Sequence, residues 1–232
     1  MAGWARGLAI VTIVVGLTAV GLQQSWIRIP AGWSPWEEVN LELPPGSMAR
    51  YQLNALSADS EACFAALDRS DLLFTALAAR PMQNGCGLTD GVRFDQSNVP
   101  YSSGFDLSCG MAAALYWYEA EVDRLAREHL GSGLARINHL GSYACRNING
   151  ATAGRRSQHA TANAIDISGL VLLDGRSVSV LADWEGETEE CRFLHAVHKR
   201  ACGLFNTVLG PEYNDLHADH FHLDMGRLRA CR

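Results

Sequence analysis

The chain has 232 residues, of which 48% are hydrophobic and 19% are charged, and this composition excludes a disordered or fibrous protein and favours one globular domain with a full core. Its formal net charge is −6, and no basic run is longer than two residues. A nucleic-acid-binding protein usually has a basic face or stripe. We therefore expect no nucleic-acid partner.

The first segment, residues 1–25, has the composition of an export signal. An almost unbroken apolar run extends from Gly7 to Leu22. It is longer than most signal-peptide cores and slightly shorter than the roughly 20 residues that span a membrane. Because VGLQQSW lacks a clean small-x-small cleavage site, we favour a signal anchor over a cleaved signal peptide, and both over a buried core helix. Trp26 and Arg28 would then lie at the outer interface.

The cysteines also indicate export. They are scattered without a CxxC pair, at Cys63, Cys86, Cys109, Cys145, Cys191, Cys202 and Cys231. Scattered cysteines in an exported chain are usually disulfide partners, whereas structural zinc sites draw on short CxxC-type spacings. The odd count leaves at least one cysteine unpaired, and the sequence alone does not determine the pairing.

A tether and two helices are predicted next along the chain. Residues 26–48 contain four of the seven prolines and predict a tether before a folded part that starts near Ala49. The stretch SADSEACFAAL, residues 57–67, predicts a short helix. In residues 108–130, apolar side chains recur at a spacing of three and four, which predicts the best helix in the chain.

The second half predicts strands and one more helix. Residues 134–148 alternate, which predicts one or two strands with a glycine bend, and residues 164–181 predict a hairpin around Asp174-Gly175. Residues 187–208 predict an amphipathic helix, and residues 220–226 a closing strand. We therefore expect an α+β fold in which a small central antiparallel sheet carries a zinc site, is flanked by helices and is stapled by disulfides.

The zinc prediction starts from two stretches. GRRSQHATANAIDISG contains His159 and Asp166, a pair that also occurs by chance, and HADHFH contains His217, His220 and His222. Alternate side chains of a strand share a face, so His220 and His222 would point the same way. A catalytic zinc takes three protein ligands and leaves the fourth position for water, and nitrogen and oxygen ligands of this kind suit Zn²⁺ better than calcium or magnesium.

These stretches resemble a known family. SQHATANAIDI resembles the SxHxxGxAxD signature of the LAS-type zinc peptidases, which include D-Ala-D-Ala carboxypeptidases and penicillin-insensitive murein endopeptidases, and HADHFH resembles their HxH motif. A longer resemblance, to the bacterial extensin-like C-terminal domain family, runs from about Pro35 to the last residue. It includes CGL at 86, LGSYACRN at 140, RRSQHATANAIDI at 155 and VLGPEYNDLHADHFHLDMG at 208. We assign residues 49–232 to this domain.

The resemblance implies a role for each site residue. The zinc ligands would be His159, Asp166 and His222. The candidates for the group that moves a proton are, in order of preference, His220, His217 and Asp219. Such a group needs hydrogen-bond reach to the attacking water. Strand alternation turns Asp219 away from the face of His222, although a bend at the strand start would restore it.

Three further residues follow from the same resemblance. Arg146 is expected near the substrate carboxylate or the developing oxyanion, with a surface salt bridge as the alternative. Ser157 is expected to contact substrate or, more simply, to support its loop. Asn163 is taken as the residue that replaces the glycine of the signature. Family positions also imply disulfides Cys63–Cys86, Cys109–Cys145 and Cys202–Cys231, with Cys191 unpaired.

The function that the resemblance implies is zinc-dependent hydrolysis of D-amino-acid-containing peptide bonds in peptidoglycan, by an endopeptidase or a D,D-carboxypeptidase. The partners would be peptidoglycan peptides and, through the N-terminal segment, the inner membrane. The domain would be periplasmic, either anchored or secreted. The alternative is a catalytically inactive zinc-bearing module that binds in the cell envelope, since fold alone does not guarantee chemistry. A third possibility is an envelope interaction protein whose histidines are incidental.

Overall fold

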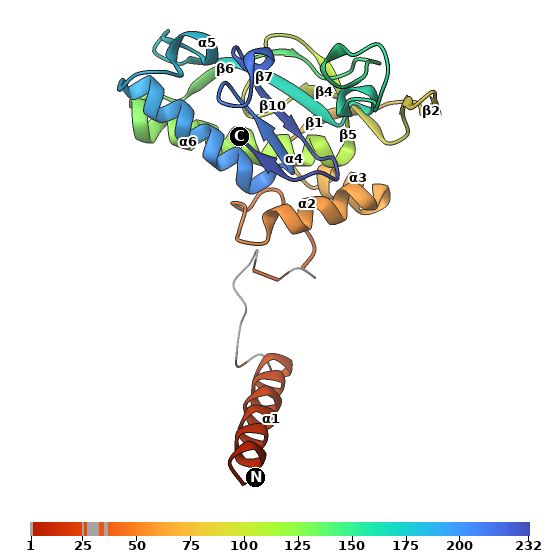
Figure 1. Ribbon diagram of the computed structural model, residues 1–232, viewed down its shortest axis with the longest axis vertical. Helices are drawn as coiled ribbons and strands as arrows, with labels where there is room; N and C mark the ends of the chain where they lie inside the picture. The colour runs from red at the N-terminus through yellow and green to blue at the C-terminus, as the bar shows by residue number, and fades with distance from the viewer. Residues whose placement is uncertain (1, 25, 27–32, 35–36) are drawn as a thin grey trace.

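The computed structural model describes residues 2–24, 26, 33–34 and 37–232 (Figure 1). Helix α1 (Ala2–Gln23) contains one stretch, Arg6–Gln23, that is long and apolar enough to cross a membrane. Only 6% of that stretch is buried, so its apolar side chains are not part of a protein core. This fits the predicted signal or anchor. Trp26 is exposed, and Arg28 lies outside the described residues.

The tether joins the folded part earlier than predicted. Val39 and Leu41 are buried in the hydrophobic core. The indole nitrogen of Trp117 donates a hydrogen bond to the backbone oxygen of Leu41, at 3.0 Å. Packing against the domain therefore starts before Ala49, the predicted start of the folded part.

Helix α4 (Cys109–Leu130) forms the centre of the core, as its apolar periodicity predicts. The five side chains of that pattern are all buried: Met111, Leu115, Tyr118, Val122 and Leu125. The helix ends at Gly131, whose φ of 69° is a left-handed conformation that glycine adopts without steric cost. Helix α4 contacts three other helices, which are α2 (Ala49–Ala58), α3 (Ser60–Asp68) and α6 (Glu189–Leu204).

The main sheet has six strands in the order β11-β9-β10-β7-β6, with β8 also paired to β7. All neighbours are antiparallel except β11 and β9. The strands are β6 (Leu134–Gly141), β7 (Ala164–Leu172), β8 (Ser177–Ser179), β9 (Thr207–Leu209), β10 (Phe221–Asp224) and β11 (Ala230–Cys231). The predicted hairpin (β7 and β8) and the predicted closing strand (β10) are confirmed. The predicted helix over 187–208 is too long, because α6 ends at Leu204 and β9 follows.

Two smaller sheets were not predicted. One has the order β1-β4-β5 and the other pairs β2 with β3. Their strands are β1 (Leu73–Ala76), β2 (Arg80–Gln83), β3 (Cys86–Leu88), β4 (Gly91–Gln96) and β5 (Phe105–Ser108). The turn between β2 and β3 has positive φ at Asn84 (49°) and Gly85 (79°), which is the Asn-Gly hairpin signal. The short elements that remain are α5 (Val180–Asp183), η1 (Ile148–Gly150), η2 (Gln158–Thr161) and η3 (Asp215–His217).

Strand alternation separates a core face of the sheet from a polar face. On β7, Ile165 and Ile167 belong to the hydrophobic core, and on β10 Phe221 and Leu223 do the same. Because successive strand side chains point to opposite faces, the residues between them point away from the core. The polar residues on the second face therefore come from neighbouring strands.

The disulfide prediction is correct for one bond. Cys202, near the end of α6, is bonded to Cys231 on β11. Cys191 is free and buried, as predicted, and its sulfur donates to the backbone oxygen of Trp184 at 3.0 Å. Three disulfides in all fit an oxidising, extracytoplasmic environment.

The other two predicted disulfides are wrong. Cys63 is bonded to Cys109, because α3 packs against α4, and the two Cα atoms are 6.1 Å apart. Cys86 is bonded to Cys145, with a Cα separation of 5.6 Å, because the β2–β3 hairpin lies against the loop that follows β6. The pairing depends on tertiary contacts that family position alone did not indicate.

Removing the Cys86–Cys145 bond is expected to destabilise the domain strongly. Loop-closure entropy for a separation of 59 residues predicts a loss of about 4 kcal/mol in the free energy of unfolding for Cys86→Ala with Cys145→Ala. Urea unfolding of the full chain in a neutral detergent measures it. As a comparison, the Cys202→Ala, Cys231→Ala pair, with a separation of 29 residues, should lose slightly less. An unchanged unfolding midpoint in the first variant would contradict the prediction.

Candidate metal centre

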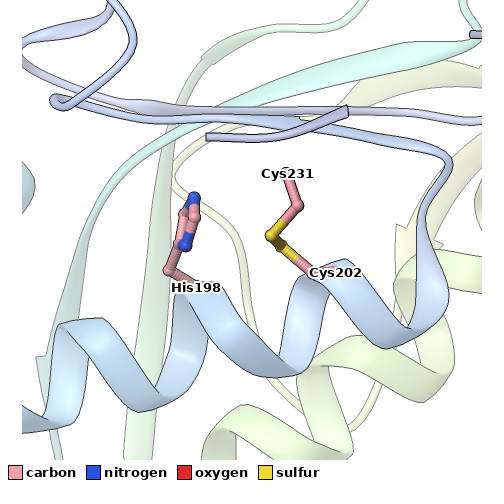
Figure 2. A group of neighbouring side chains, drawn as sticks. All are labelled: His198, Cys202 and Cys231. Carbon is pink, nitrogen blue, oxygen red and sulfur yellow. A yellow bond between two sulfur atoms is a disulfide. The ribbon is translucent and has the colours of Figure 1, made fainter. Parts of the chain in front are cut away.

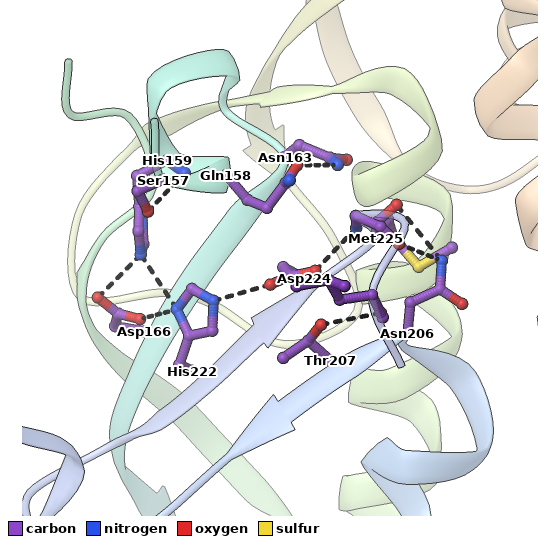
Figure 3. Close-up of polar contacts among 12 residues, drawn as sticks. Ser157, Gln158, His159, Asn163, Asp166, Asn206, Thr207, His222, Asp224 and Met225 are labelled. Atoms are coloured by element: carbon purple, nitrogen blue, oxygen red, sulfur yellow. Dashed lines mark hydrogen bonds and ion pairs between the residues drawn. The ribbon is translucent and has the colours of Figure 1, made fainter. Parts of the chain in front are cut away.

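The three predicted ligands meet on the polar face of the sheet (Figure 3). Asp166 on β7 and His222 on β10 are direct cross-strand partners, so their side chains point to the same side. His159 comes from η2, the short helix that leads into β7. The side chains of all three are nearly buried, with exposed fractions of 3% for His159, 9% for Asp166 and 12% for His222.

The ligand atoms are close enough to share one ion. His159 Nε2 lies 3.2 Å from Asp166 Oδ2 and 3.2 Å from His222 Nδ1. His222 Nδ1 lies 2.9 Å from Asp166 Oδ1. A tetrahedral zinc with bonds of about 2.0 to 2.1 Å places its ligand atoms about 3.3 Å apart. The two histidine nitrogens are 3.2 Å apart, and each lies 2.9 to 3.2 Å from one oxygen of Asp166, Oδ2 for His159 and Oδ1 for His222, so these separations are in the range that one shared ion needs.

Two outer contacts determine which ring nitrogen of each histidine carries a lone pair. His159 Nδ1 lies 2.8 Å from the backbone oxygen of Ser142, and His222 Nε2 lies 3.0 Å from Asp224 Oδ2. A carbonyl and a carboxylate only accept, so these nitrogens donate their hydrogens outward. With both rings neutral, the inward nitrogens and Asp166 are acceptors that face one another without a donor, so the group needs either a proton on an inward nitrogen or a cation. Such a set requires a positive charge between its members, and a metal-bound histidine usually has an outer partner of this kind.

The pKa values of Asp166 and His222 also indicate that this group of side chains favours a positive charge. Burial raises the pKa of Asp166, but hydrogen bonds with His159 and His222 outweigh burial and hold this pKa well below its usual range. Burial lowers the pKa of His222, but Asp166 and Asp224 together raise it to about 9. The ring of His222 therefore attracts a proton where no metal is bound. The three residues therefore form a candidate metal site.

Arg146 lies at the edge of this group, as predicted. Its guanidinium is 3.8 Å from Asp166 Oδ2, and its side chain is 46% exposed. It therefore pairs with a candidate ligand and lines the cleft, and its contact with a substrate carboxylate or oxyanion stays a prediction. A fixed positive charge in this position suits a carboxylate or an oxyanion.

His220 reaches the site with one nitrogen and is held by the other. Its Nε2 is 3.7 Å from Asp166 Oδ1, and its Nδ1 is 2.7 Å from Asp219 Oδ1. Asp219 is 55% exposed, so it contacts the site through His220. Because the carboxylate accepts the Nδ1 hydrogen, His220 keeps a lone pair on Nε2.

His217 is the third histidine of the HADHFH stretch, beside His220 and His222. It is buried, and its Nδ1 lies 2.7 Å from Asn214 Oδ1, which also accepts from the backbone nitrogen of Leu216. Burial, together with His220 and His222, lowers the pKa of His217 to about 4. His217 is therefore neutral near pH 7 and carries its lone pair on Nε2.

The loop before β7 is held by local hydrogen bonds. Ser157 Oγ accepts from the backbone nitrogen of His159 at 3.3 Å and caps η2, which fits its supporting role. The left-handed residue of the loop is Ala162, with φ of 52°. The glycine of the signature therefore corresponds to Ala162, and its assignment to Asn163 in the sequence analysis is wrong. Asn163 instead donates to Gln158 Oε1 at 2.9 Å.

A cleft of about 400 Å³ opens over the three ligands and is also lined by Arg146, His217 and His220. The exposed side chains of Tyr213 and Leu216 lie on its wall. Water and a small peptide group can therefore reach the ligands. The sequence analysis missed Ser142, Asn214 and Asp224; for Asp224, strand alternation from His222 was an available signal.

Within the described residues, a second group of metal-ligand types consists of His198, Cys202 and Cys231. Figure 2 shows that the two sulfur atoms are bonded to each other. They are therefore not thiolates, which are the form of cysteine that binds metal. His198 Nε2 lies 3.1 Å from the backbone oxygen of Arg232. This group does not bind a metal while the disulfide is intact.

The chain is thus a disulfide-bonded α+β domain behind an apolar N-terminal helix, with a candidate three-ligand metal site on its main sheet. The family model described as extensin-like protein C-terminus matches residues 61–232, and the chain belongs to this family. That range contains every candidate site residue. No curated protein and no solved structure matches the chain.

Proposed function

We propose that this protein is a zinc-dependent hydrolase of D-amino-acid-containing peptide bonds in peptidoglycan, acting as an endopeptidase or a D,D-carboxypeptidase. The proposal places the domain in the periplasm, with α1 as its signal or inner-membrane anchor. Support for the substrate comes from the likeness of SQHATANAIDI and HADHFH to the LAS-type zinc peptidases. Support for an exported domain comes from the three disulfides and the apolar helix.

One observation carries the chemistry. His159 Nε2 and His222 Nδ1 lie 3.2 Å apart, and each is 2.9 to 3.2 Å from an oxygen of Asp166, in the lining of an open cleft. A structural zinc site is closed by four protein ligands, whereas a catalytic site has three and leaves one position open. The arrangement therefore favours catalysis over a purely structural metal.

The surrounding residues supply the remaining functions. When bound, zinc would polarise a substrate carbonyl and lower the pKa of a water molecule. Arg146, 3.8 Å from Asp166, would hold a substrate carboxylate or the oxyanion that develops. His220, oriented by Asp219, has Nε2 free to accept a proton and to return it to the leaving amine. His217, buried and neutral, is the second candidate for this transfer.

The test separates metal binding from catalysis. We expect the full chain in a neutral detergent to release shortened or uncrosslinked peptides from purified peptidoglycan, measured by mass spectrometry. His220→Gln removes the proton-transfer group but none of the three ligands. It is expected to retain zinc and to lower kcat by about 10² to 10⁴. The product masses identify the bond that is cut.

Each other outcome has a defined meaning. Equal rates for His220→Gln and wild type would contradict the proton-transfer role of His220. Zinc binding without any change in the peptides would contradict the hydrolase and favour the zinc-bearing binding module. A chelator that leaves wild-type cleavage unchanged would contradict the role of the metal.

A further inference from the structure

A second cleft, of about 810 Å³, adjoins the cleft over the metal ligands, of about 400 Å³. The two clefts share six lining residues: Ile148, Arg155, Arg156, Gln158, Gly226 and Leu228. The two clefts are therefore adjacent, and together we call them the groove. We call the part over the ligands the metal arm and the larger part the second arm.

The second arm has an excess of positive charge. Arg155, Arg156 and Arg227 line it, with one carboxylate, Asp90. Among the residues that the structure describes, no carboxylate lies within 4.0 Å of any of these three guanidinium groups. The chain as a whole carries a formal charge of −6, so a surface with three arginines and one carboxylate departs from the average charge of the molecule.

One of the three arginines is held in position. Arg156 donates from Nε to the backbone oxygen of Asn84, at 2.8 Å, and from Nη1 to Asn147 Oδ1, at 3.0 Å. Neither acceptor is charged, so the guanidinium keeps its full positive charge toward the groove. The Cys86–Cys145 disulfide joins the two segments that carry these acceptors. The wall of the second arm is therefore fixed before a ligand arrives, which lowers the entropic cost of binding.

The residues that line both arms include exposed apolar side chains. Ile148 and Leu228 line both clefts and are 41% and 60% exposed, and Met82 in the second arm is 52% exposed. Exposed apolar side chains beside arginines favour a ligand that carries both apolar and anionic groups. A chain lying in the groove would contact these side chains on its way from one arm to the other.

We propose that the second arm binds a carboxylate-bearing stretch of the same peptide chain whose scissile bond lies in the metal arm. This inference rests on the proposed function for the identity of that chain. The anionic character of the ligand rests only on Arg155, Arg156 and Arg227. The groove thus selects acidic peptides through these arginines, of which Arg227 lines only the second arm.

Binding of a hexaglutamate peptide to the full chain in a neutral detergent, measured by calorimetry at low salt, tests the charge of the second arm without hydrolysis. Hexaglutamine is the uncharged control peptide. The double variant Arg155→Gln, Arg227→Gln is expected to bind hexaglutamate about 10-fold more weakly, since each exposed ion pair contributes up to about 1 kcal/mol. Arg136→Gln, an exposed arginine outside both clefts, controls for a general loss of positive charge.

Hexaglutamate binding that depends on Arg155 and Arg227, but not on Arg136, supports the proposal. Equal binding of the two peptides, or an equal loss in Arg136→Gln, overturns it. Cleavage of peptidoglycan with an unchanged KM in the double variant would also overturn it and leave the proposed hydrolase intact. Conversely, specific hexaglutamate binding by a chain that cleaves nothing would retain the arginine-lined groove as an anion-binding surface and reject the hydrolase.

Discussion

His222→Ala is expected to reduce bound zinc from about one ion per chain to none, since a catalytic zinc keeps three protein ligands. The variant removes one of three converging atoms and leaves Asp166 and His159 unable to complete the site. Hydrolysis should be lost with the metal. Zinc content after gel filtration, measured by atomic emission, gives the first readout, and peptide release gives the second.

Two matched variants locate the metal. His198→Ala removes a histidine from the only other group of ligand types found in the described residues, which contains the Cys202–Cys231 disulfide. It should retain wild-type zinc. Asp224→Asn leaves the three ligands and removes only the outer carboxylate of His222, so zinc affinity should fall about 10- to 100-fold. Loss of zinc in His198→Ala with retention in His222→Ala would reverse the assignment.

The second large effect concerns Glu119, a fully buried carboxyl on α4. Its Oε2 accepts hydrogen bonds from Ser97 and Tyr101, at 2.8 and 3.0 Å, whereas its Oε1 has no partner. Burial outweighs these hydrogen bonds and raises the pKa of Glu119 from 4.5 to about 8. The folded protein therefore holds this proton up to a pH at which the unfolded chain has lost it.

Because the folded protein binds this proton more tightly than the unfolded chain does, the contribution of Glu119 to the free energy of unfolding decreases as the pH rises. The contribution is complete below pH 4.5, decreases between pH 4.5 and about 8, and is constant above that range. A difference from 4.5 to about 8 corresponds to about 5 kcal/mol in the free energy of unfolding. The expected direction is opposite to that of a carboxylate that is ion-paired in the folded state.

Glu119→Gln tests this expectation, because glutamine resembles the protonated acid and does not titrate. The free energy of unfolding of the variant, minus that of wild type, should increase by about 5 kcal/mol between pH 4.5 and 8. Urea unfolding at several pH values measures it. Glu128→Gln, at an exposed position of the same helix paired with Arg124, should show no comparable change. Parallel curves for Glu119→Gln and wild type would show that Glu119 does not titrate in this range.

The elements that have a regular apolar spacing or a local turn signal could be predicted from the sequence. The apolar spacing in α4 and the Asp174-Gly175 turn each have a local physical cause. The same holds for the site, because alternation in β10 places His222 and Asp224 on one face. His159 follows from its place just before β7, and the family signature identifies it. Local rules therefore indicated the shared face on β10, whereas the resemblance named His159, Asp166 and His222 as candidate ligands.

Features set by tertiary contact could not be predicted in the same way. Strands β1 and β2 are mostly exposed, so no alternation of apolar residues marked them. The pairing of Cys63 with Cys109 depends on how α3 meets α4. The outer partner of His159 is a backbone oxygen of Ser142, and every residue has such an oxygen, so side-chain type carries no information about it. Contacts of this kind are visible only in three dimensions.

The direct pairing of His222 with Asp166 also links the candidate metal site to the alignment of β10 with β7. A slip of β10 by one residue along β7 would turn His222 toward the hydrophobic core and Phe221 toward the cleft. The convergence of the three candidate ligands therefore depends on the correct alignment of β10 with β7. A chain in which β10 is shifted by one residue would lose the convergence of the candidate ligands and the packing of the core together.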